Sequence, residues 1–369
     1  MVCNCLHRYY NFYLYLHENV LYNRYVSSYI MKGNPMNIYD ISEIAGVSIA
    51  TVSRVINGNA KVSPKTRDKV LKTMDDWGYT PNAFARGLGL NSMKTIGIMC
   101  ADSSDPFMAK AIFYLERSLR QNNYDVLLCC TGYALSDKNN YLKLLLSKRI
   151  DAIILVGSNF VEAATADNDY IRKAAEKVPV MILNGALSGS NIYATVSDDY
   201  TGVHEATRRL TNKGSKHIHY LYNAHSYSGN HKRTGFIDAM ADQGLIQEQL
   251  LAMTHYIDGG IQEARSALNA LAQEGIVIEG IIAADDTLAV GALKFAKDKH
   301  LSVPDDLAII GYNNSIIATC CEPELTSIDN NVEALSKACI DNLMTVIAGN
   351  QVPSQTIYPA KLIERGTTL

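Results

Sequence analysis

Residues 37–59 read NIYDISEIAGVSIATVSRVINGN, and this stretch decides the fold of the N-terminal part of the chain. Its apolar residues recur at helical spacing twice, once before and once after Gly46-Val47-Ser48. The pattern predicts two short helices that share one small core, a helix-turn-helix. Asn37 and Ser48 are of the residue types that cap helix N-termini, and Asp40 lies where a negative charge favours the helix dipole.

The second predicted helix presents an unusual outward face once Val52, Val55 and Ile56 are turned toward the core. A solvated helix face normally carries several charges of both signs, whereas this one offers small polar groups and a single arginine, which suits a close approach to base edges. An αα-hairpin without any DNA contact has the same pattern, so that alternative stays open. The residues predicted to contact DNA are Ser48, Ile49, Ala50, Thr51, Ser53, Arg54 and Asn57.

A third helix is expected from residue 64 to about residue 77. Ser63 is a suitable cap for it, and Pro64 is favoured at a first helical position. Gly78-Tyr79-Thr80-Pro81 then breaks the chain, and residues 82–88 lead to the next domain.

Residues 38–88 closely resemble the headpiece and hinge of the LacI/GalR family of bacterial transcription repressors. The motifs that carry the resemblance are DISEIAGVSIATVSRVINGNAKVSPKTRDKV and GYTPNAFARGL, and the similarity continues to the C-terminus. It implies that the second helix enters the major groove, where Ile49 and Ala50 select bases and Arg54 contacts a guanine. It also implies that the hinge folds into a short helix on the operator and that Leu88 wedges into the minor groove. The alternative for Leu88 is a linker residue buried against the core domain.

Composition sets the scale of the molecule. The chain has 369 residues, of which 47% are hydrophobic, which is enough for about two to three domain-sized units. Of its net charge of −3, residues 36–95 contribute eight Lys and Arg against five Asp and Glu, and residues 96–369 contribute 23 against 31. A basic small domain fits phosphate contact. The eight cysteines show no CxxC motif and no metal-ligand spacing, so we expect thiols in a reducing cytoplasm and neither a metal nor a cofactor.

Residues 1–35 lie outside the pattern. They are rich in tyrosine and poor in charge, and they contain neither a continuous apolar core nor a cleavage site of a signal peptide. We expect a translated leader that is not part of the native protein, or a disordered extension. Codons for Lys32-Gly33-Asn34-Pro35 can contain a purine-rich ribosome-binding run ahead of Met36, which would then be the native start.

From residue 95 onward, apolar runs of strand length alternate with helical stretches. The alternation predicts βαβ units in parallel sheets that helices cover on both faces, and the number of units suggests two sheets. Ligands in this architecture bind at the carboxyl ends of the strands, so a two-lobed version places its site in the cleft between the lobes. The runs lie at residues 95–99, 125–130, 152–156, 180–183, 217–222, 280–283 and 307–310.

The resemblance implies a core like a periplasmic sugar-binding protein, with two lobes joined by three crossovers. The predicted fold class is therefore an all-α helix-turn-helix headpiece plus an α/β core of two doubly wound parallel-sheet lobes. We place the crossovers near residues 194–198, 322–329 and 347–355. The predicted boundaries are a headpiece at 36–80, a hinge and linker at 81–94, a first lobe at about 95–195 and 326–348, and a second lobe at about 197–323 and 352–369.

Candidate effector contacts come from loops at strand ends. Asp105 and Phe107 follow the first core strand; in sugar-binding relatives the matching polar residue bonds hydroxyls and the aromatic ring stacks on the sugar. The alternative for Asp105 is that it only caps a helix. Asp286 matches the acidic residue that binds effector in many members, and Asp285 stands where Asn is usual. Two adjacent carboxylates repel, so we expect one to cap the following helix and the other to face the cleft.

Two further loops depart from the family pattern. Most sugar-responsive members have an arginine three residues before Gly235, where this chain has Lys232, with Arg233 one residue later. A lysine is a point charge and lacks the arginine fork that grips two hydroxyls or a carboxylate, so the identity of the effector stays open. Asn313 stands where Asp is frequent, which makes the site less acidic; a simple strand-to-helix turn is the alternative there. The predicted effector contacts are Asp105, Phe107, Lys232, Arg233, Asp286 and Asn313.

The predicted function is a cytoplasmic transcription regulator, a repressor of carbohydrate metabolism genes. It is expected to bind a palindromic DNA operator as a homodimer, because one headpiece offers only a half-site, and to be controlled by a sugar or sugar phosphate in the cleft. One alternative is a regulator of the catabolite-control type, whose co-regulator is a phosphorylated carrier protein, and another is a sugar-binding protein without DNA function. An enzyme is disfavoured because no GxxxxGK[ST] loop, nucleophile elbow or metal-ligand cluster occurs.

Overall fold

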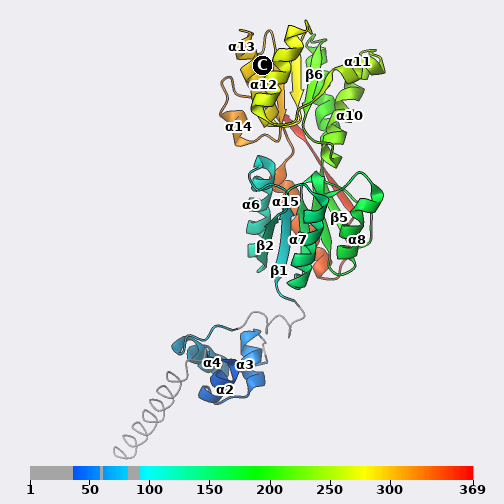
Figure 1. Ribbon diagram of the computed structural model, residues 1–369. Helices are drawn as coiled ribbons and strands as arrows, with labels where there is room; N and C mark the ends of the chain where they lie inside the picture. The colour runs from blue at the N-terminus through cyan, green and yellow to red at the C-terminus, as the bar shows by residue number, and fades with distance from the viewer. Residues whose placement is uncertain (1–35, 59–60, 82–91, 369) are drawn as a thin grey trace, which may run out of the picture. The chain divides into compact units, whose positions relative to one another are not determined.

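The computed structural model describes residues 36–58, 61–81 and 92–368. The chain divides into two compact units, Met1–Asn91 and Ser92–Leu369, and each is described by itself (Figure 1). Within the described ranges, no helix is both long enough and apolar enough to cross a membrane.

The first unit is the predicted helix-turn-helix followed by a third helix. Its helices are α2 (Ile38–Ile44), α3 (Ile49–Ile56) and α4 (Pro64–Asp76). The apolar stripes seen in the sequence meet in one small core, because each helix is too short to be stable without tertiary packing. The buried members of this core are Ile41, Ala45, Val52, Val55 and Val70.

Side-chain caps fix where these short helices begin. Asn37 Oδ1 accepts a hydrogen bond from the Tyr39 amide at 2.9 Å, and the Asn37 amide donates to Asp40 Oδ2 at 2.8 Å, which forms a capping box. The Thr51 amide donates to Ser48 Oγ at 3.2 Å at the start of α3. Between the two helices Gly46 has a φ of 59°, in the left-handed region that favours glycine.

The second unit consists of two lobes, each built on a six-stranded sheet. The first sheet has the order β11-β5-β4-β3-β1-β2, and all its strand pairs are parallel. The second has the order β12-β10-β9-β8-β6-β7, in which only β12 runs antiparallel to its neighbour. The strands of the first sheet are β1 (Thr95–Cys100), β2 (Asp125–Cys130), β3 (Ala152–Val156), β4 (Val180–Leu183), β5 (Ile192–Asp198) and β11 (Gln355–Pro359); those of the second are β6 (Ile218–Tyr222), β7 (Thr254–Tyr256), β8 (Gly280–Ala283), β9 (Ala308–Tyr312), β10 (Thr326–Asp329) and β12 (Lys361–Ile363).

Helices cover the sheets, as the alternating pattern predicts (Figure 1). In the first lobe α6 and α15 share a core on one face of the sheet, and α7 and α8 enclose a second core on the other face. In the second lobe α9 packs against α10 and α12 against α13. The helices of the first lobe are α6 (Pro106–Gln121), α7 (Leu135–Ser147), α8 (Asp169–Ala175) and α15 (Val332–Ile347); those of the second are α9 (Asp199–Asn212), α10 (Tyr227–Ala241), α11 (Gln247–Ala252), α12 (Ile261–Gln273), α13 (Asp286–Asp298) and α14 (Ile316–Thr319). Two 3₁₀ turns, Ser158–Phe160 and Thr165–Asn168, complete the first lobe.

The crossovers lie partly elsewhere than predicted. β10 pairs with β9 in the second sheet, whereas residues 326–329 were expected in the first lobe, and β11 pairs with β5 in the first sheet, whereas residues 355–359 were expected in the second. The chain therefore crosses after Asp198, as expected, and then at residues 330–331 and at Ala360. β11 is an edge strand whose residues alternate between exposed and half-buried, so it has no apolar run to mark it in the sequence.

Candidate functional site

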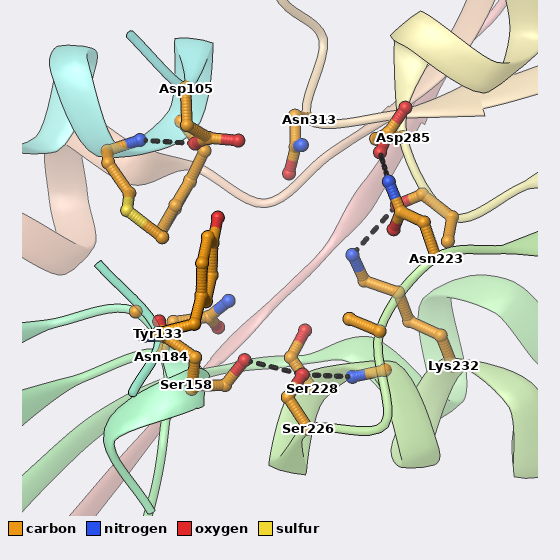
Figure 2. A pocket seen from close by; sticks show the side chains of 17 residues that line it. Asp105, Tyr133, Ser158, Asn184, Asn223, Ser226, Ser228, Lys232, Asp285 and Asn313 are labelled. Atoms are coloured by element: carbon orange, nitrogen blue, oxygen red, sulfur yellow. Dashed lines mark hydrogen bonds between the residues drawn. The ribbon is translucent and has the colours of Figure 1, made fainter. Parts of the chain in front are cut away.

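The two lobes of the second unit enclose a pocket of about 230 Å³ (Figure 2). Its walls come from both lobes, mostly from loops that directly follow strands, as the architecture predicts. The volume lies below the roughly 300–1,000 Å³ range of drug-sized ligand pockets. The pocket therefore suits a small ligand that contacts both lobes at once.

Asp105 and Phe107 both line this pocket on the side of the first lobe. Asp105 is the N-cap of α6, and its Oδ1 accepts a hydrogen bond from the Met108 amide at 2.8 Å. Both readings of Asp105 therefore hold geometrically, because one oxygen caps the helix while the residue lines the cavity. Burial raises the pKa of this carboxyl, and the charge of Asp285 raises it further.

The acidic residue at the pocket on the second lobe is Asp285 and not Asp286. Asp285 caps α13 by accepting from the Leu288 amide at 2.8 Å, and its Oδ2 accepts from Asn223 Nδ2 at 2.9 Å at the pocket wall (Figure 2). Asp286 is only 2% exposed and is not among the residues that line the pocket. The expectation was that one carboxylate caps the helix and the other faces the cleft. In the structure Asp285 does both, because the first turn of α13 directs the Asp286 side chain inward.

Asp286 has an internal role instead. Its Oδ2 accepts from the Ser315 amide at 2.7 Å and from Ser315 Oγ at 2.8 Å, and its Oδ1 accepts from Ser327 Oγ at 2.6 Å. A Cβ at Gly311 would collide with Asp286 Oδ1, so the glycine leaves room for the carboxylate. Asp286 thus joins α13 to the segments after β9 and in β10.

Lys232 is the basic group of the pocket, and Arg233 is not part of it. Lys232 is 7% exposed, and its Nζ donates to the carbonyl of Ala284 at 3.0 Å and lies 3.6 Å from the centre of the Tyr312 ring. Burial lowers the pKa of Lys232, and the nearby Asp199 opposes that shift. Arg233 lies about 100° further round α10, where its Nη1 donates to Tyr222 Oη at 3.3 Å. The structure therefore contradicts the placement of Arg233 at the effector site.

Asn313 lines the pocket at the end of β9. Its φ of 89° is in the region that L residues rarely adopt, and its amide donates to the carbonyl of Ile328 at 2.8 Å. Its Oδ1 accepts from Asn330 Nδ2 at 2.9 Å, which fixes the side-chain amide in orientation. Asn313 is therefore both part of a strand-end turn and a pocket residue.

Several polar residues of the pocket are not among the predicted effector contacts. Asn184 follows β4 and is 7% exposed, yet its Oδ1 has no hydrogen-bond partner among the described residues. Both amide atoms of Asn159, which follows β3, are buried and likewise without a partner there. Buried amides are nearly always hydrogen-bonded, so these atoms mark positions where a ligand or water would bind. The rule that polar residues directly after strands form the site would have found Asn184, whereas Asn159 lies in the 3₁₀ turn Ser158–Phe160.

Other missed residues connect the two lobes or extend the polar wall. Ser158 Oγ, from the first lobe, donates to Ser226 Oγ, from the second, at 2.8 Å (Figure 2). Tyr133 is 63% exposed and lines the cavity opposite the second lobe. With Phe107 it offers aromatic surface beside amides, hydroxyls and carboxylates. This combination is suited to a ligand that is rich in hydroxyl groups.

The second candidate site is the outward face of α3. Ser48, Ala50 and Arg54 are exposed, and Ile49 is 39% exposed although it is a large apolar residue. Thr51, Ser53 and Asn57 are half-buried along the same helix. Leu88 lies outside the described residues. The face thus carries the residues predicted for base contacts, on a helix whose opposite side is buried in the core.

No group of three or more His, Cys, Asp or Glu residues that could hold a metal occurs within the described ranges.

Both units of the chain are similar to known proteins. Residues 37–82 match the model of bacterial regulatory proteins of the lacI family, and residues 207–368 match a periplasmic binding protein-like domain. An HTH-type transcriptional regulator of Lachnoclostridium phytofermentans is 54% identical over 334 residues, which cover 90% of this chain and 99% of the relative.

Solved structures share the fold. The lac repressor dimer bound to operator and the anti-inducer ONPF superposes with a TM-score of 0.81 at 23% identity, covering 91% of this chain and 100% of that one. A complex of the transcriptional regulator CelR with cellobiose gives a TM-score of 0.66 at 22% identity, covering 90% and 99%. These structures show the fold, whereas the lacI-family match of the helix-turn-helix and the regulator that is 54% identical over 90% of this chain show that the chain belongs to the lacI family of bacterial regulatory proteins and is a DNA-binding transcription regulator.

Proposed function

We propose that this protein is a cytoplasmic repressor of carbohydrate metabolism genes that binds a palindromic operator as a homodimer and whose affinity for DNA is set by a sugar in the interlobe pocket. The observation that carries the proposal is the pocket itself. Amides, hydroxyls, two carboxylates and aromatic rings from both lobes meet there, so a polyhydroxylated ligand would bridge the lobes. A change in lobe arrangement is the type of movement by which a ligand controls a distant site.

The DNA part of the proposal rests on α3. Ile49, Ala50 and Arg54 are exposed on a helix that its own core holds rigid, which suits entry into the major groove. One such helix reads a half-site, so a palindrome requires two copies of the chain. A pseudo-palindrome is therefore the first operator to test. The solved lac repressor is likewise a dimer on its operator.

The charges of the pocket favour an uncharged sugar over a sugar phosphate. Asp105 and Asp285 are two carboxylates against one ammonium, that of Lys232. The ammonium already donates to a carbonyl and lies on the Tyr312 ring, and the N-termini of α6 and α13 already carry their carboxylate caps. A phosphate dianion would therefore meet net negative charge without a free cation. CelR, a structural relative, is solved with the neutral sugar cellobiose.

The proposed effector contacts follow from this geometry. They are the two carboxylates, the ammonium, the two unpartnered amides, the Phe107 ring and the Asn313 amide, and they come from both lobes. The set is Asp105, Phe107, Asn159, Asn184, Lys232, Asp285 and Asn313.

Fluorescence anisotropy tests the proposal. The 36–369 protein is titrated onto a labelled pseudo-palindrome at several salt concentrations, alone and with a panel of neutral sugars and their phosphates. We expect tight binding that weakens with salt, because phosphate contacts release counterions, and that one neutral sugar shifts. A chain that starts at Ser92 serves as the control and should not bind the operator.

Each part of the proposal has its own contradicting result. Operator binding by the chain that lacks residues 1–91 would refute the role of α3. Binding that no sugar alters would refute the effector and leave the DNA role intact, which turns attention to the phosphorylated carrier protein. Tighter binding of a sugar phosphate than of its parent sugar would refute the charge argument.

A further inference from the structure

Two cysteine thiols lie side by side at the ends of the first two core strands. Cys100 is the last residue of β1 and Cys130 the last residue of β2, and the two residues are directly paired in the parallel ladder. Their Sγ atoms are 3.7 Å apart. Cys100 is fully buried, whereas Cys130 is exposed.

The sheet fixes which cysteine can reach Cys100. Neighbouring strands lie roughly 4.7–4.9 Å apart, and disulfides span Cα separations of about 4.4–6.8 Å, so the paired backbones are within range. Successive side chains on a strand point to opposite faces, so Cys129 is paired with Met99 on the other face of the sheet. Cys129 therefore points away from Cys100 although it is adjacent to Cys130.

The surroundings assign different roles to the two thiols. Burial, followed by the hydrogen bond with Cys130, raises the pKa of Cys100 to about 12, so Cys100 remains protonated and shielded. Cys130 is the accessible member of the pair. An oxidant from solution would thus meet Cys130 first, with the Cys100 thiol already in van der Waals contact behind it.

We propose that Cys100 and Cys130 form an oxidisable thiol pair, a modification site at which hydrogen peroxide produces an intramolecular disulfide. The Cys130 thiolate attacks one peroxide oxygen, the O–O bond breaks, and water leaves after the second oxygen takes up a proton. The resulting Cys130 sulfenic acid is attacked by the sulfur of Cys100; the S–S bond forms, the S–O bond breaks, and the thiol proton leaves with the hydroxyl as water. Two thiols lose two electrons in total, and one peroxide is reduced to two water molecules.

The cysteine pair lies at strand ends that lead into the loops of the pocket. The Thr131 amide donates to the carbonyl of Cys100 at 2.9 Å, and the Gly132 amide donates to the carbonyl of Ala101 at 2.9 Å, so the ladder continues past both cysteines. The loops that follow carry Asp105 and Tyr133 to the pocket. A disulfide here would join the two strand ends that support the first-lobe wall of the pocket.

Peptide mapping tests the proposal without any ligand or DNA, so its outcome is independent of the proposed function. The reduced full-length protein is treated with hydrogen peroxide, its free thiols are alkylated in urea, and it is digested with trypsin. Cys100 falls in the peptide of residues 95–110, and both Cys129 and Cys130 fall in the peptide of residues 121–138. We expect the two peptides to be disulfide-linked as the major oxidised product and dithiothreitol to separate them.

Matched variants locate the bond. Cys129→Ser should retain the linked product, and Cys130→Ser, at an exposed position, should lose it while keeping the circular dichroism spectrum of the parent. A bond between Cys129 and Cys130 within one peptide would overturn the proposal. So would sulfinic or sulfonic acid at Cys130 with Cys100 recovered as the alkylated thiol.

Discussion

Asn184 is one of two pocket residues whose buried side-chain amide lacks a hydrogen-bond partner among the described residues. Its side chain is buried, its Oδ1 accepts no hydrogen bond from the described residues, and its φ of 63° is one that asparagine tolerates better than most residues. A buried amide oxygen without a hydrogen-bond donor lowers the stability of the fold unless a ligand supplies the donor. The residue thus reports directly on whether the pocket is built for a ligand.

Asn184→Gly removes this amide and keeps a backbone that accepts positive φ. We expect the affinity for the strongest sugar of the panel to fall roughly 2- to 10-fold, since a hydrogen bond contributes about 0.5–1.5 kcal/mol. Isothermal titration calorimetry measures the affinity, and urea unfolding of the free protein should change little. An unaltered affinity would exclude Asn184 from the ligand contacts.

Asp285 and Asp286 provide a matched pair of neighbours with different roles. Asp286→Ala leaves Ser315 and Ser327 without their buried acceptor, so we expect a loss of stability of about 3 kcal/mol or more in urea unfolding. Asp285→Ala removes a helix cap, which costs about 1 kcal/mol, but takes a carboxylate from the pocket. It should therefore weaken sugar binding more than it weakens the fold. The reverse order of effects would restore Asp286 as the effector contact.

At the scale of elements, α3 has a buried face and a reading face that can be separated by substitution. Val52→Ala opens space in the headpiece core, where Val52 is fully buried, and should cost about 2 kcal/mol of headpiece stability. Ile49→Ala changes an exposed residue, so the thermal unfolding of the headpiece should be unchanged while operator affinity falls. Circular dichroism and anisotropy measure the two effects. Equal loss of stability in both variants would show that Ile49 supports the fold rather than contacts DNA.

Strands β6 and β7 are joined by a histidine pair that makes the second lobe sensitive to acid. His219 Nε2 donates to the carbonyl of Val277 at 3.1 Å, so its Nδ1 accepts from His255 Nε2 at 2.9 Å and both rings are neutral. Burial lowers the pKa of both, from 6.5 to about 4 for His255. In the unfolded chain these histidines bind protons below about pH 6.5, whereas the folded pair resists protonation.

The contribution of this histidine pair to the free energy of unfolding is therefore fully present above pH 6.5 and is lost as the pH falls from 6.5 toward 4. Urea midpoints measured between pH 7.5 and 4.5 should decline, and His255→Gln should decline less over the same window. A parallel decline in both proteins would assign the acid sensitivity to other groups.

At the scale of the whole molecule, the two units have separate cores, so their activities should separate as well. A chain that begins at Ser92 should fold, bind the same sugar as the full chain and fail to bind the operator. A ligand present at 100 times its Kd should stabilise this unit by about 2.7 kcal/mol, because it binds only the folded form. Thermal unfolding with and without the sugar measures this. A sugar affinity that disappears along with residues 1–91 would mean that the first unit contributes to the pocket.

The sequence determined every feature that depends on neighbours along the chain. Two apolar stripes around Gly46-Val47-Ser48 specified the helix-turn-helix, and the caps at Asn37, Ser48 and Ser63 specified where its helices begin. The apolar runs of the central strands predicted parallel sheets, because strands that helices cover on both faces must be apolar throughout. Strands with mixed or polar residues, such as β10 and β11, gave no such signal.

Only the tertiary structure decided what depends on the meeting of distant segments. Helical rotation by one residue places Lys232 in the pocket and Arg233 against Tyr222, and the start of α13 gives the cleft to Asp285 rather than Asp286. Pairing across the sheet decides that Cys100 meets Cys130 and not Cys129. Local sequence patterns determine which face of each helix or strand is apolar. Which side chains meet in the pocket depends on how the elements pack against one another. That alignment between distant elements cannot be deduced from the pattern of neighbouring residues.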